Sequence, residues 1–420
     1  MTTIADSLND LEIHHLSICT KDSTPEERLM RGVIKCGETI VCKSFGHTPE
    51  IVHTDSAEVQ AMIQPLIEQK IRAFKSFEGS ILRIWCWNGE WHLSTFRKID
   101  AFKSRWGTQK SYGEMFIDAL ISHKTEYQGL ADCEDASFFT DYCKKLNPDY
   151  TYVFLMRSGK DSKLVCNAFT APQVFIVGAF DRSKDFAYVP GRNCTECVVP
   201  SSVEVEVNSV DDCVNIVANL NVREYQGLIF ISDEGKAVKL VNETYYKMLN
   251  LRDNVPNVFV RYVQLKQNAS KDLDLFLNVY QEKQEEFANF DLVLSDISKN
   301  IHKKYLQRYI QGKVVVVPND QFYIMKELHQ KHIADRSYKV TEPAVVSYVA
   351  GLKAISQVQL YESYCKRKTE LGNGNFVPEE MRQKIFAQLH DWSEPKSLID
   401  IAQKKRTQPN KNRPPRQNKN

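Results

Sequence analysis

The 420-residue sequence contains no apolar run of about 18 residues, the length that a membrane-spanning helix needs. Its first residues, MTTIADSLNDLEIHH, lack the charged and apolar regions of a secretory signal peptide. Glycine and proline, at 17 and 15 residues, are too few for a collagen-like or low-complexity chain. We therefore expect a soluble, intracellular protein of two or three domains with no membrane partner.

Neither sign of charge dominates the chain, whose formal net charge is +2. The tail after Asp400, IAQKKRTQPNKNRPPRQNKN, nevertheless carries seven basic residues and no acid, which leaves the body at −5. A basic arm rich in Pro, Asn and Gln is typical of disorder and suits a polyanion such as RNA or DNA. The alternative is a disordered end that only keeps the protein in solution.

The sequence holds 11 cysteines but no recognisable disulfide framework, so we expect reduced thiols. Cys194 and Cys197 form a single CxxC pair, whereas a structural zinc site needs four ligands. No second pair and no matching histidine pair follow. The sequence therefore predicts no metal site of this kind.

Residues 30–255 are predicted to be mainly antiparallel β-structure. Asn88-Gly89 between the apolar runs 81–87 and 90–96 is a strong hairpin signal. Further strand pairs are predicted at 33–36 with 39–44, 151–156 with 163–169, and 228–232 with 237–241. Helices are predicted between them, at 111–123 and 137–145. Strand pairs interleaved with helices indicate an α+β fold.

The pattern becomes helical beyond about residue 258, where Leu294, Ile297 and Ile301 recur at helical spacing. Further helices are predicted at 321–332, 342–355, 357–367 and 378–392. The predicted organisation is an N-terminal segment 1–24, an α+β domain 25–257, an α-helical domain 258–392 and a disordered basic tail 393–420.

The segment from Lys75 to Gly113 is the densest in chemically useful side chains. Five basic residues and one acid lie between Arg97 and Lys110, interleaved with aromatic rings. Cations contact phosphates and aromatic faces stack on bases, a combination typical of nucleotide or single-stranded nucleic-acid binding. The alternative is an amphipathic edge whose aromatics are core and whose cations are solvated.

The sequence resembles the covalent nucleotidyltransferase superfamily of RNA ligases and mRNA-capping enzymes at Glu78-Gly79-Ser80 and in the hairpin that follows. The return strand of this hairpin carries STFRK. The order of the remaining segments matches the order of the superfamily motifs. These segments are the Arg31-Gly32 strand, KSFGHTPE (43–50) as the segment before the nucleotide pocket, TYVFLMRSGKDSKLV (151–165), QVFIVGAFD (173–181), YQGLIFIS (225–232) and VKLVNETYY (238–246).

A closer resemblance is to the immediate-early proteins of iridoviruses and their counterparts in other large DNA viruses. It covers roughly residues 25–370, includes IHKKYLQRYIQG (301–312), and is most specific at STFRKIDAFKSRWG. It implies a viral early protein acting in the cytoplasm or nucleus of a host cell. KKRTQPNKNRPPR fits a nuclear signal as well as an RNA arm.

The resemblance implies an antiparallel-sheet, ligase-like domain that uses ATP and Mg²⁺ on nucleic-acid ends, with GTP and DNA as open alternatives to ATP and RNA. In the superfamily a lysine attacks the α-phosphate and forms a lysyl-nucleotide. The catalytic candidates here are Lys75 and Glu78. The positions that match phosphate- or nucleotide-binding motifs are Arg31, Gly79, Ser80, Arg97, Lys98, Gln226, Lys236 and Lys239.

Three positions depart from the superfamily pattern. Ser76 stands where the lysine belongs, Leu155 or Met156 where a carboxylate belongs, and Gln226 where a glutamate belongs. Lys75 is adjacent, but neighbouring side chains on a strand point to opposite faces, so only a bulge would turn it into the pocket. Lys70 is a more remote substitute.

Two functions are therefore compatible with the sequence. The first, which we adopt as the more concrete hypothesis, is a viral, ATP-dependent, RNA ligase-like nucleotidyltransferase that acts on nucleic-acid ends with a displaced nucleophile. The second is a catalytically inactive early regulatory protein that keeps the pocket and binds nucleotide or RNA. The departures favour the second function, whereas the retained Arg-Gly, EGS, STFRK and Lys239 elements favour the first.

Overall fold

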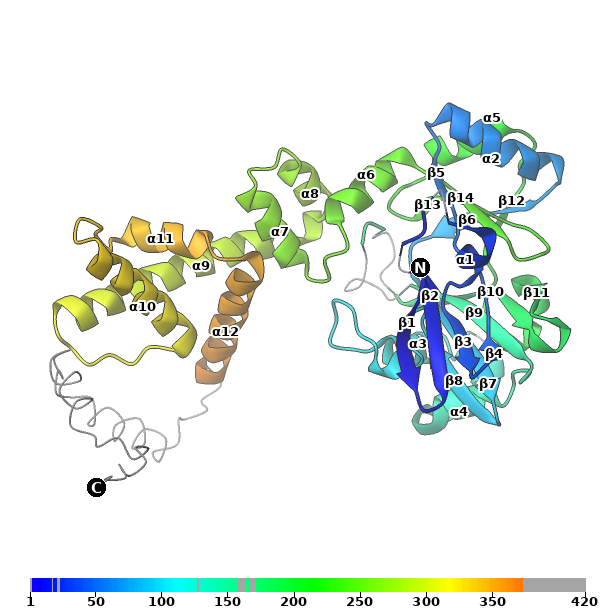
Figure 1. The fold of residues 1–420 in the computed structure, drawn as a ribbon, viewed down its shortest axis with the longest axis horizontal. Helices are drawn as coiled ribbons and strands as arrows, with labels where there is room; N and C mark the ends of the chain where they lie inside the picture. The colour runs from blue at the N-terminus through cyan, green and yellow to red at the C-terminus, as the bar shows by residue number, and fades with distance from the viewer. Residues whose placement is uncertain are drawn as a thin grey trace, which may run out of the picture. The chain divides into compact units, whose positions relative to one another are not determined.

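The computed structural model describes residues 2–16, 18–20, 23–126, 128–157, 164–166 and 171–372. The chain divides into two compact units (Figure 1). The first contains residues up to 261 together with 271–281, and the second contains residues 262–270 and those from 282 onward. Within the described part of the chain, no helix is long and apolar enough to cross a membrane. The predicted α+β class is confirmed.

The first unit begins with a four-stranded antiparallel sheet (Figure 1). Its strands, in spatial order, are β1 (Thr2–Leu8), β2 (Leu11–Leu16), β3 (Val33–Cys36) and β4 (Thr39–Cys42). The β3–β4 hairpin was predicted from the sequence, whereas no strand was predicted for β1 and β2. Helix α1 (Pro25–Leu29) lies between β2 and β3 in the sequence and begins at a capping box formed by Thr24 and Glu27.

A second sheet contains the Asn-Gly hairpin. Its order is β11 (Ala187–Pro190), β10 (Gln173–Asp181), β9 (Tyr150–Arg157), β7 (Ser80–Trp87) and β8 (Glu90–Ser94). Asn88 and Gly89 both have positive φ angles, 50° and 79°, as a tight hairpin turn requires. Helices α3 (Tyr112–Ser122) and α4 (Phe138–Cys143) contribute to the hydrophobic core of this sheet.

One predicted strand pair in this region is wrong. Strand β9 pairs with β10 and β7, and residues 164–166 form no strand. The remainder of the predicted 163–169 strand lies outside the described residues. The pairing differs because β10, which begins at Gln173, supplies the apolar alternation that the neighbouring strand needs.

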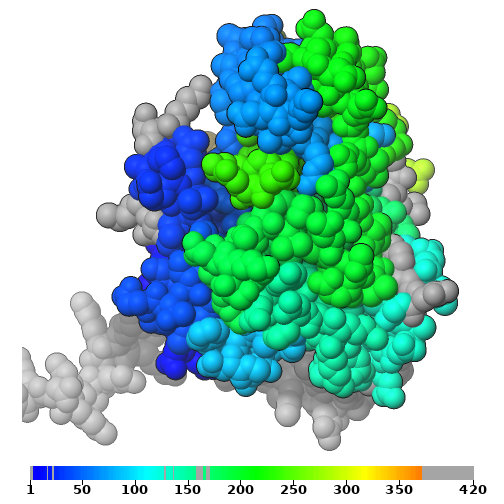
Figure 2. Space-filling model, turned by 90° about the vertical axis from the view of Figure 1, so that its right-hand side faces the viewer, coloured from blue at the N-terminus to red at the C-terminus, as the bar shows by residue number. Residues whose placement is uncertain are grey.

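A third sheet has the order β12 (Glu204–Val205), β6 (Arg72–Phe77), β13 (Tyr225–Ile231), β14 (Ala237–Val241) and β5 (Glu50–Val52). Its strands are antiparallel apart from β5, which runs parallel to β14. Helices α2 (Ser56–Glu68) and α5 (Val210–Ala218) cover one face, and Figure 2 shows them side by side at the surface. The other face of this sheet borders the cavity described below.

Helices α6 (Glu243–Arg252) and α8 (Leu273–Val279) complete the first unit, and α7 (Val258–Gln267) runs from the first unit into the second. The second unit also contains α9 (Gln284–Tyr305), α10 (Asn319–Ala334), α11 (Glu342–Ala350) and α12 (Ala354–Gly372). The apolar stripe predicted on α9 is buried at Leu294, Ile297 and Ile301. The predicted helix 378–392 and the tail 393–420 lie outside the described residues.

Short 3₁₀ and π turns connect several elements. They are η1 (Ala101–Lys103), η2 (Gln128–Leu130), η3 (Asp135–Ser137), η4 (Arg182–Lys184), η5 (Gly191–Asn193), η6 (Thr195–Cys197), η7 (Gln281–Lys283) and the π turn η8 (Leu306–Ile310).

Two glycines lie where the backbone of a neighbouring strand approaches closely. Gly79 lies in the connection between β6 and β7, and a Cβ there would lie 2.5 Å from the Met156 carbonyl oxygen. Gly227 follows an irregularity in β13, has a φ of 156°, and presents its backbone to the Leu240 carbonyl. A side chain at either position would push two backbones apart.

Replacing Gly227 by alanine should lower the free energy of unfolding by about 3 kcal/mol or more, since backbone strain and overpacking each cost about 1–3 kcal/mol. Gly37→Ala is the matched control, because Gly37 also has a positive φ, 57°, but faces open space. It should lose only about 1–2 kcal/mol. Urea unfolding followed by circular dichroism measures both, and equal losses would contradict the assigned close approach.

Candidate functional site

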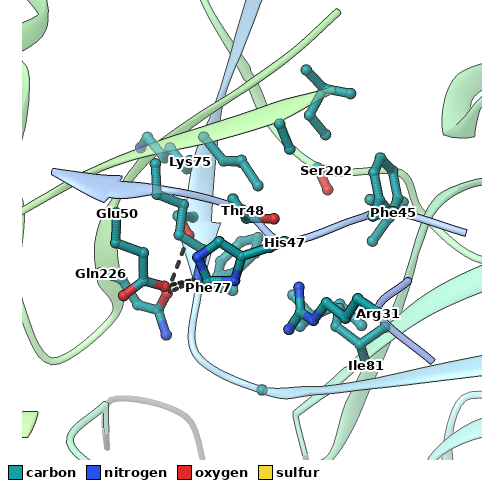
Figure 3. A pocket seen from close by; sticks show the side chains of 18 of the residues that line it. Arg31, Phe45, His47, Thr48, Glu50, Lys75, Phe77, Ile81, Ser202 and Gln226 are labelled. Atoms are coloured by element: carbon teal, nitrogen blue, oxygen red, sulfur yellow. Dashed lines mark hydrogen bonds and ion pairs between the residues drawn. The ribbon is translucent and has the colours of Figure 1, made fainter. Parts of the chain in front are cut away.

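A cavity of about 570 Å³ lies between the open face of the third sheet and the second sheet (Figure 3). One part of its wall is apolar, and a second part is polar and charged. The apolar residues are Phe45, Phe77, Ile81, Leu155, Val177, Ile229, Ile231 and Ala237. The polar and charged residues include Arg31, His47, Glu50, Ser76, Gln226 and Lys239. Such a combination suits a small ligand with an apolar body and an anionic group.

The side chain of Gln226 organises the polar wall. Its Oε1 accepts hydrogen bonds from Ser76 Oγ at 3.2 Å and from Lys239 Nζ at 3.1 Å. Its Nε2 donates to the Tyr245 hydroxyl at 2.9 Å. Lys239 Nζ also pairs with Glu50 Oε1 at 2.9 Å, because parallel pairing of β5 with β14 places the two residues opposite each other. The dashed lines in Figure 3 mark interactions of this group.

Glu78 lies behind the cavity wall rather than in it. Its side chain is 7% exposed and accepts hydrogen bonds from the backbone N–H groups of residues 164–166 and from the Tyr245 hydroxyl. Burial raises the pKa of Glu78 above its usual value, and these four hydrogen bonds oppose that rise. Glu78 therefore anchors the backbone of residues 164–166 and the phenol of Tyr245.

Lys75 lines the cavity, although strand alternation predicted that it would point away from it and its register position lies on the opposite face of β6 from Ser76. It pairs in register with Leu228, which packs in the core beneath α2 and α5. Its ammonium nitrogen lies 4.7 Å from the centroid of the Tyr225 ring. The irregularity in the β6–β13 pairing lies in β13, so it leaves the strand alternation of β6 intact. Lys70 lies in the turn after α2 and is not among the residues that line the cavity.

Arg31 lines the cavity, and its guanidinium group makes two contacts with neighbouring segments. Its Nη1 donates to the Gly46 carbonyl at 3.3 Å, and its guanidinium lies 4.2 Å from the centroid of the Phe96 ring. Burial lowers the pKa of Arg31 from its usual value, and the nearby Arg83 adds to that shift. Gly79 also lines the cavity.

The remaining predicted phosphate ligands lie elsewhere. Ser80 and Arg97 line a neighbouring cavity. Lys98 pairs with Asp6 at 2.9 Å, and Lys236, whose side chain is 77% exposed, pairs with Glu234 at 2.7 Å. The structure therefore brings together Arg31, Lys75, Gly79, Gln226 and Lys239 around one cavity and separates the other five.

Several residues of the site lie in segments that the resemblance included but were not named individually as site residues, among them Glu50, His47, Phe45 and Tyr245. Glu50 belongs to a three-residue strand, and no local pattern shows that this strand pairs in parallel with β14. Tyr245 is positioned by α6, whose first turn is capped by Asn242 Oδ1 accepting from the backbone of residues 244 and 245. The asparagine cap in VNETYY is a signal that places Tyr245 near a helix start.

The divalent metal implied by the resemblance needs carboxylate ligands. Of the described residues that line the cavity, Glu50 alone carries a carboxylate, and it is paired with Lys239. Leu155 stands on the wall where the resemblance implies an acidic residue. Among the residues that the structure describes, no group of three or more His, Cys, Asp or Glu side chains is arranged to hold a metal ion. These residues do not fit a resident Mg²⁺.

No protein-family model matches the sequence. The chain is 24% identical over 345 residues to the immediate-early protein ICP-46 homolog of Invertebrate iridescent virus 6, a match that covers 80% of this chain and 75% of that protein. It is 22% identical over 268 residues to immediate-early protein ICP-46 of Frog virus 3 (isolate Goorha), covering 62% and 64%. These relatives confirm the resemblance to the iridovirus immediate-early proteins.

The chain also has similarity to solved ligase structures. A mutant RNA ligase of Naegleria gruberi with AMP and Mn has a TM-score of 0.31 and 11% identity, over 45% of this chain and 55% of that chain. A structure described as a putative ATP-dependent DNA ligase from Aquifex aeolicus has a TM-score of 0.35 and 11% identity, over 65% of each chain.

Replacing Glu78 by glutamine should lower the free energy of unfolding by about 1–3 kcal/mol. The NH₂ group of the glutamine would replace a carboxylate oxygen that accepts from backbone N–H groups, and these donors would be left unsatisfied. Glu243→Gln is the control. Glu243 forms an exposed i,i+4 pair with Lys247, worth about 0.3–0.5 kcal/mol. Urea unfolding at neutral pH measures both variants, and equal effects would show that Glu78 is not the anchor described.

Proposed function

We propose that the chain is a nucleotide-binding protein of the iridovirus immediate-early type, whose cavity holds a nucleotide without forming a lysyl-nucleotide. This is the second of the two functions that the sequence allows. The observation that carries the proposal is the Ser76 hydroxyl, which stands where the resembling nucleotidyltransferases carry their lysine and donates a hydrogen bond to Gln226.

A lysyl-nucleotide requires an uncharged amine that reaches the α-phosphate. Two lysines line the cavity among the described residues, Lys75 and Lys239. The Lys75 ammonium lies at the border of the cavity, 4.7 Å from the centroid of the Tyr225 ring. Lys239 is paired with Glu50, and this partner favours the charged amine over the neutral one. Ser76 itself contacts an amide oxygen, which is not a base able to activate its hydroxyl.

The same residues are well suited to binding. The apolar wall around Phe45, Leu155 and Ile229 accommodates a base or sugar, and Arg31 and Lys239 supply positive charge for phosphate. A phosphate that approaches Lys239 competes with Glu50 for its ammonium group. Nucleotide affinity is therefore expected to be moderate. An RNA or single-stranded nucleic-acid partner follows from the same chemistry and from the resemblance.

Replacing Lys239 by glutamine should weaken ATP binding by about 10- to 100-fold, since a hydrogen bond to a charged group contributes about 1.5–3 kcal/mol. Lys236→Gln is the matched control on the same hairpin, because Lys236 is exposed and paired with Glu234 outside the cavity. It should bind ATP as the unaltered protein does. Isothermal titration calorimetry measures all three affinities, and equal losses in the two variants would place the phosphate elsewhere.

Label transfer tests the absence of a covalent step. Incubation with ATP or GTP labelled at the α-phosphate, with Mg²⁺ or Mn²⁺, should leave no labelled band on a denaturing gel. A band that disappears in Lys75→Ala or Lys239→Ala would identify that lysine as a nucleophile. It would contradict the proposal and establish the ligase-like enzyme instead.

A further inference from the structure

A second cavity, of about 510 Å³, adjoins the first. Both cavities are lined by Arg31, His47, Ile81 and Phe96, so they share one wall. The second cavity extends from this wall towards β2, the residues that follow β8, and the start of α3. Each volume falls in the range of about 300–1,000 Å³ that is typical of small-ligand sites.

The second cavity is lined by positive charge. Arg28, Arg31, Arg97 and Arg105 line it, and no Asp or Glu is found among its described lining residues. Within the described part of the chain, Arg31, Arg97 and Arg105 form no ion pair with a carboxylate. Arg105 Nε donates to the Gln109 carbonyl at 2.8 Å, and Arg97 Nε to His15 Nε2 at 3.4 Å. Guanidinium groups so placed attract a phosphorylated ligand.

A buried arginine adds to this charge from behind the wall. The Arg83 side chain is fully buried and donates to the carbonyls of Gly32 and Thr95, which adjoin Arg31 and Phe96 in the sequence. The Phe96 ring contacts both guanidinium groups, with Arg31 at 4.2 Å and Arg83 at 5.0 Å from its centroid. Arg83 therefore fixes the shared wall and raises the positive potential on it.

His15 responds to the same potential. Burial, together with Arg97, Arg31 and Arg83, lowers the pKa of His15 to about 4. At neutral pH the imidazole is uncharged, so its Nε2 acts as an acceptor for Arg97 and adds no charge of its own. Burial, together with Arg31 and Arg28, also lowers the pKa of His47, the other histidine among the described lining residues. The positive charge of the cavity at neutral pH thus comes from arginine.

Aromatic side chains complete the second cavity. Trp106 and Tyr112 line it beside Arg97 and Arg105, and Phe96 lines it on the shared wall. Aromatic faces interleaved with cations bind single-stranded nucleic acid by stacking on bases while the cations contact phosphates. A simple inorganic anion would not require the rings.

We propose that the two cavities form a single site for two consecutive nucleotides of a single strand. The first nucleotide occupies the apolar cavity, the linking phosphate lies beside Arg31, and the second base stacks in the cavity lined by Trp106 with phosphate contacts to Arg97 and Arg105. This inference rests on the proposed nucleotide binding and specifies its ligand. The preferred ligand is a dinucleotide unit rather than a mononucleotide.

The test compares ADP with the 5′-phosphorylated diadenylate pApA, each of which carries two phosphates, by calorimetry on the full chain. One additional stacked base should make pApA bind about 5- to 150-fold more tightly than ADP. Arg97→Gln and Trp106→Ala should each bring this ratio towards 1. The exposed residue Lys103 lines neither cavity, so Lys103→Gln is the control and should keep the ratio.

Two results would overturn the inference while leaving nucleotide binding in place. One is ADP or ATP binding at least as tightly as pApA, which would assign the second cavity to a phosphate tail. The other is a ratio that survives in both variants. Arg97 is exposed, so its variant is informative even where Trp106→Ala fails to fold. Binding of neither ADP nor pApA would overturn the proposed function as well. The deoxy form of pApA distinguishes an RNA ligand from a DNA ligand.

Discussion

The cavity depends on one chain of hydrogen bonds that begins at a buried carboxylate. Glu78 binds three backbone N–H groups of residues 164–166 and the hydroxyl of Tyr245, and Tyr245 in turn accepts from Gln226. Because a buried carboxylate without donors is strongly unfavourable, these partners are held in place. The amide of Gln226 is thereby oriented with its oxygen towards Ser76 and Lys239.

The three departures from the ligase pattern form a consistent set in the structure. The resemblance implies a lysine at position 76, an acidic residue at position 226 and another at position 155 or 156. Here Ser76 and Gln226 are neutral and bond to each other, and Leu155 joins the apolar wall. Neutral and apolar side chains at all of these positions leave no unpaired charge buried there. On the proposed function, the cavity binds a nucleotide without the groups that the covalent chemistry requires.

Local patterns in the sequence were sufficient for three of the four predicted strand pairs and for the register position of Lys75. Asn88-Gly89 specified the β7–β8 turn, and strand alternation placed Lys75 on the face opposite Ser76. Contacts between distant segments were not predictable in this way. Examples are the parallel pairing of β5 with β14, which brings Glu50 to Lys239, and the pairing of Lys98, which is not among the residues that line the two cavities, with Asp6.

Arg83 also illustrates this difference between what local sequence patterns predict and what only the contacts between distant segments determine. Its position inside the apolar run 81–87 marks it as unusual in the sequence. Its partners, the carbonyls of Gly32 and Thr95, follow only from the assembled fold. In the same way, the basic and aromatic residues between 96 and 110 were predicted to bind nucleic acid. Their division between a second cavity and the surface depends on which of them find acidic partners.

The central claim is that the cavity beside Gln226 holds an intact nucleotide without a covalent bond. A crystal structure of the full chain with ATP and Mg²⁺ tests it most directly. The account predicts density for a complete nucleotide against Phe45 and Ile229, with a phosphate displacing Glu50 from Lys239. Density continuous from a lysine amine to a nucleoside monophosphate, or a cavity that stays empty at saturating ATP, would contradict it.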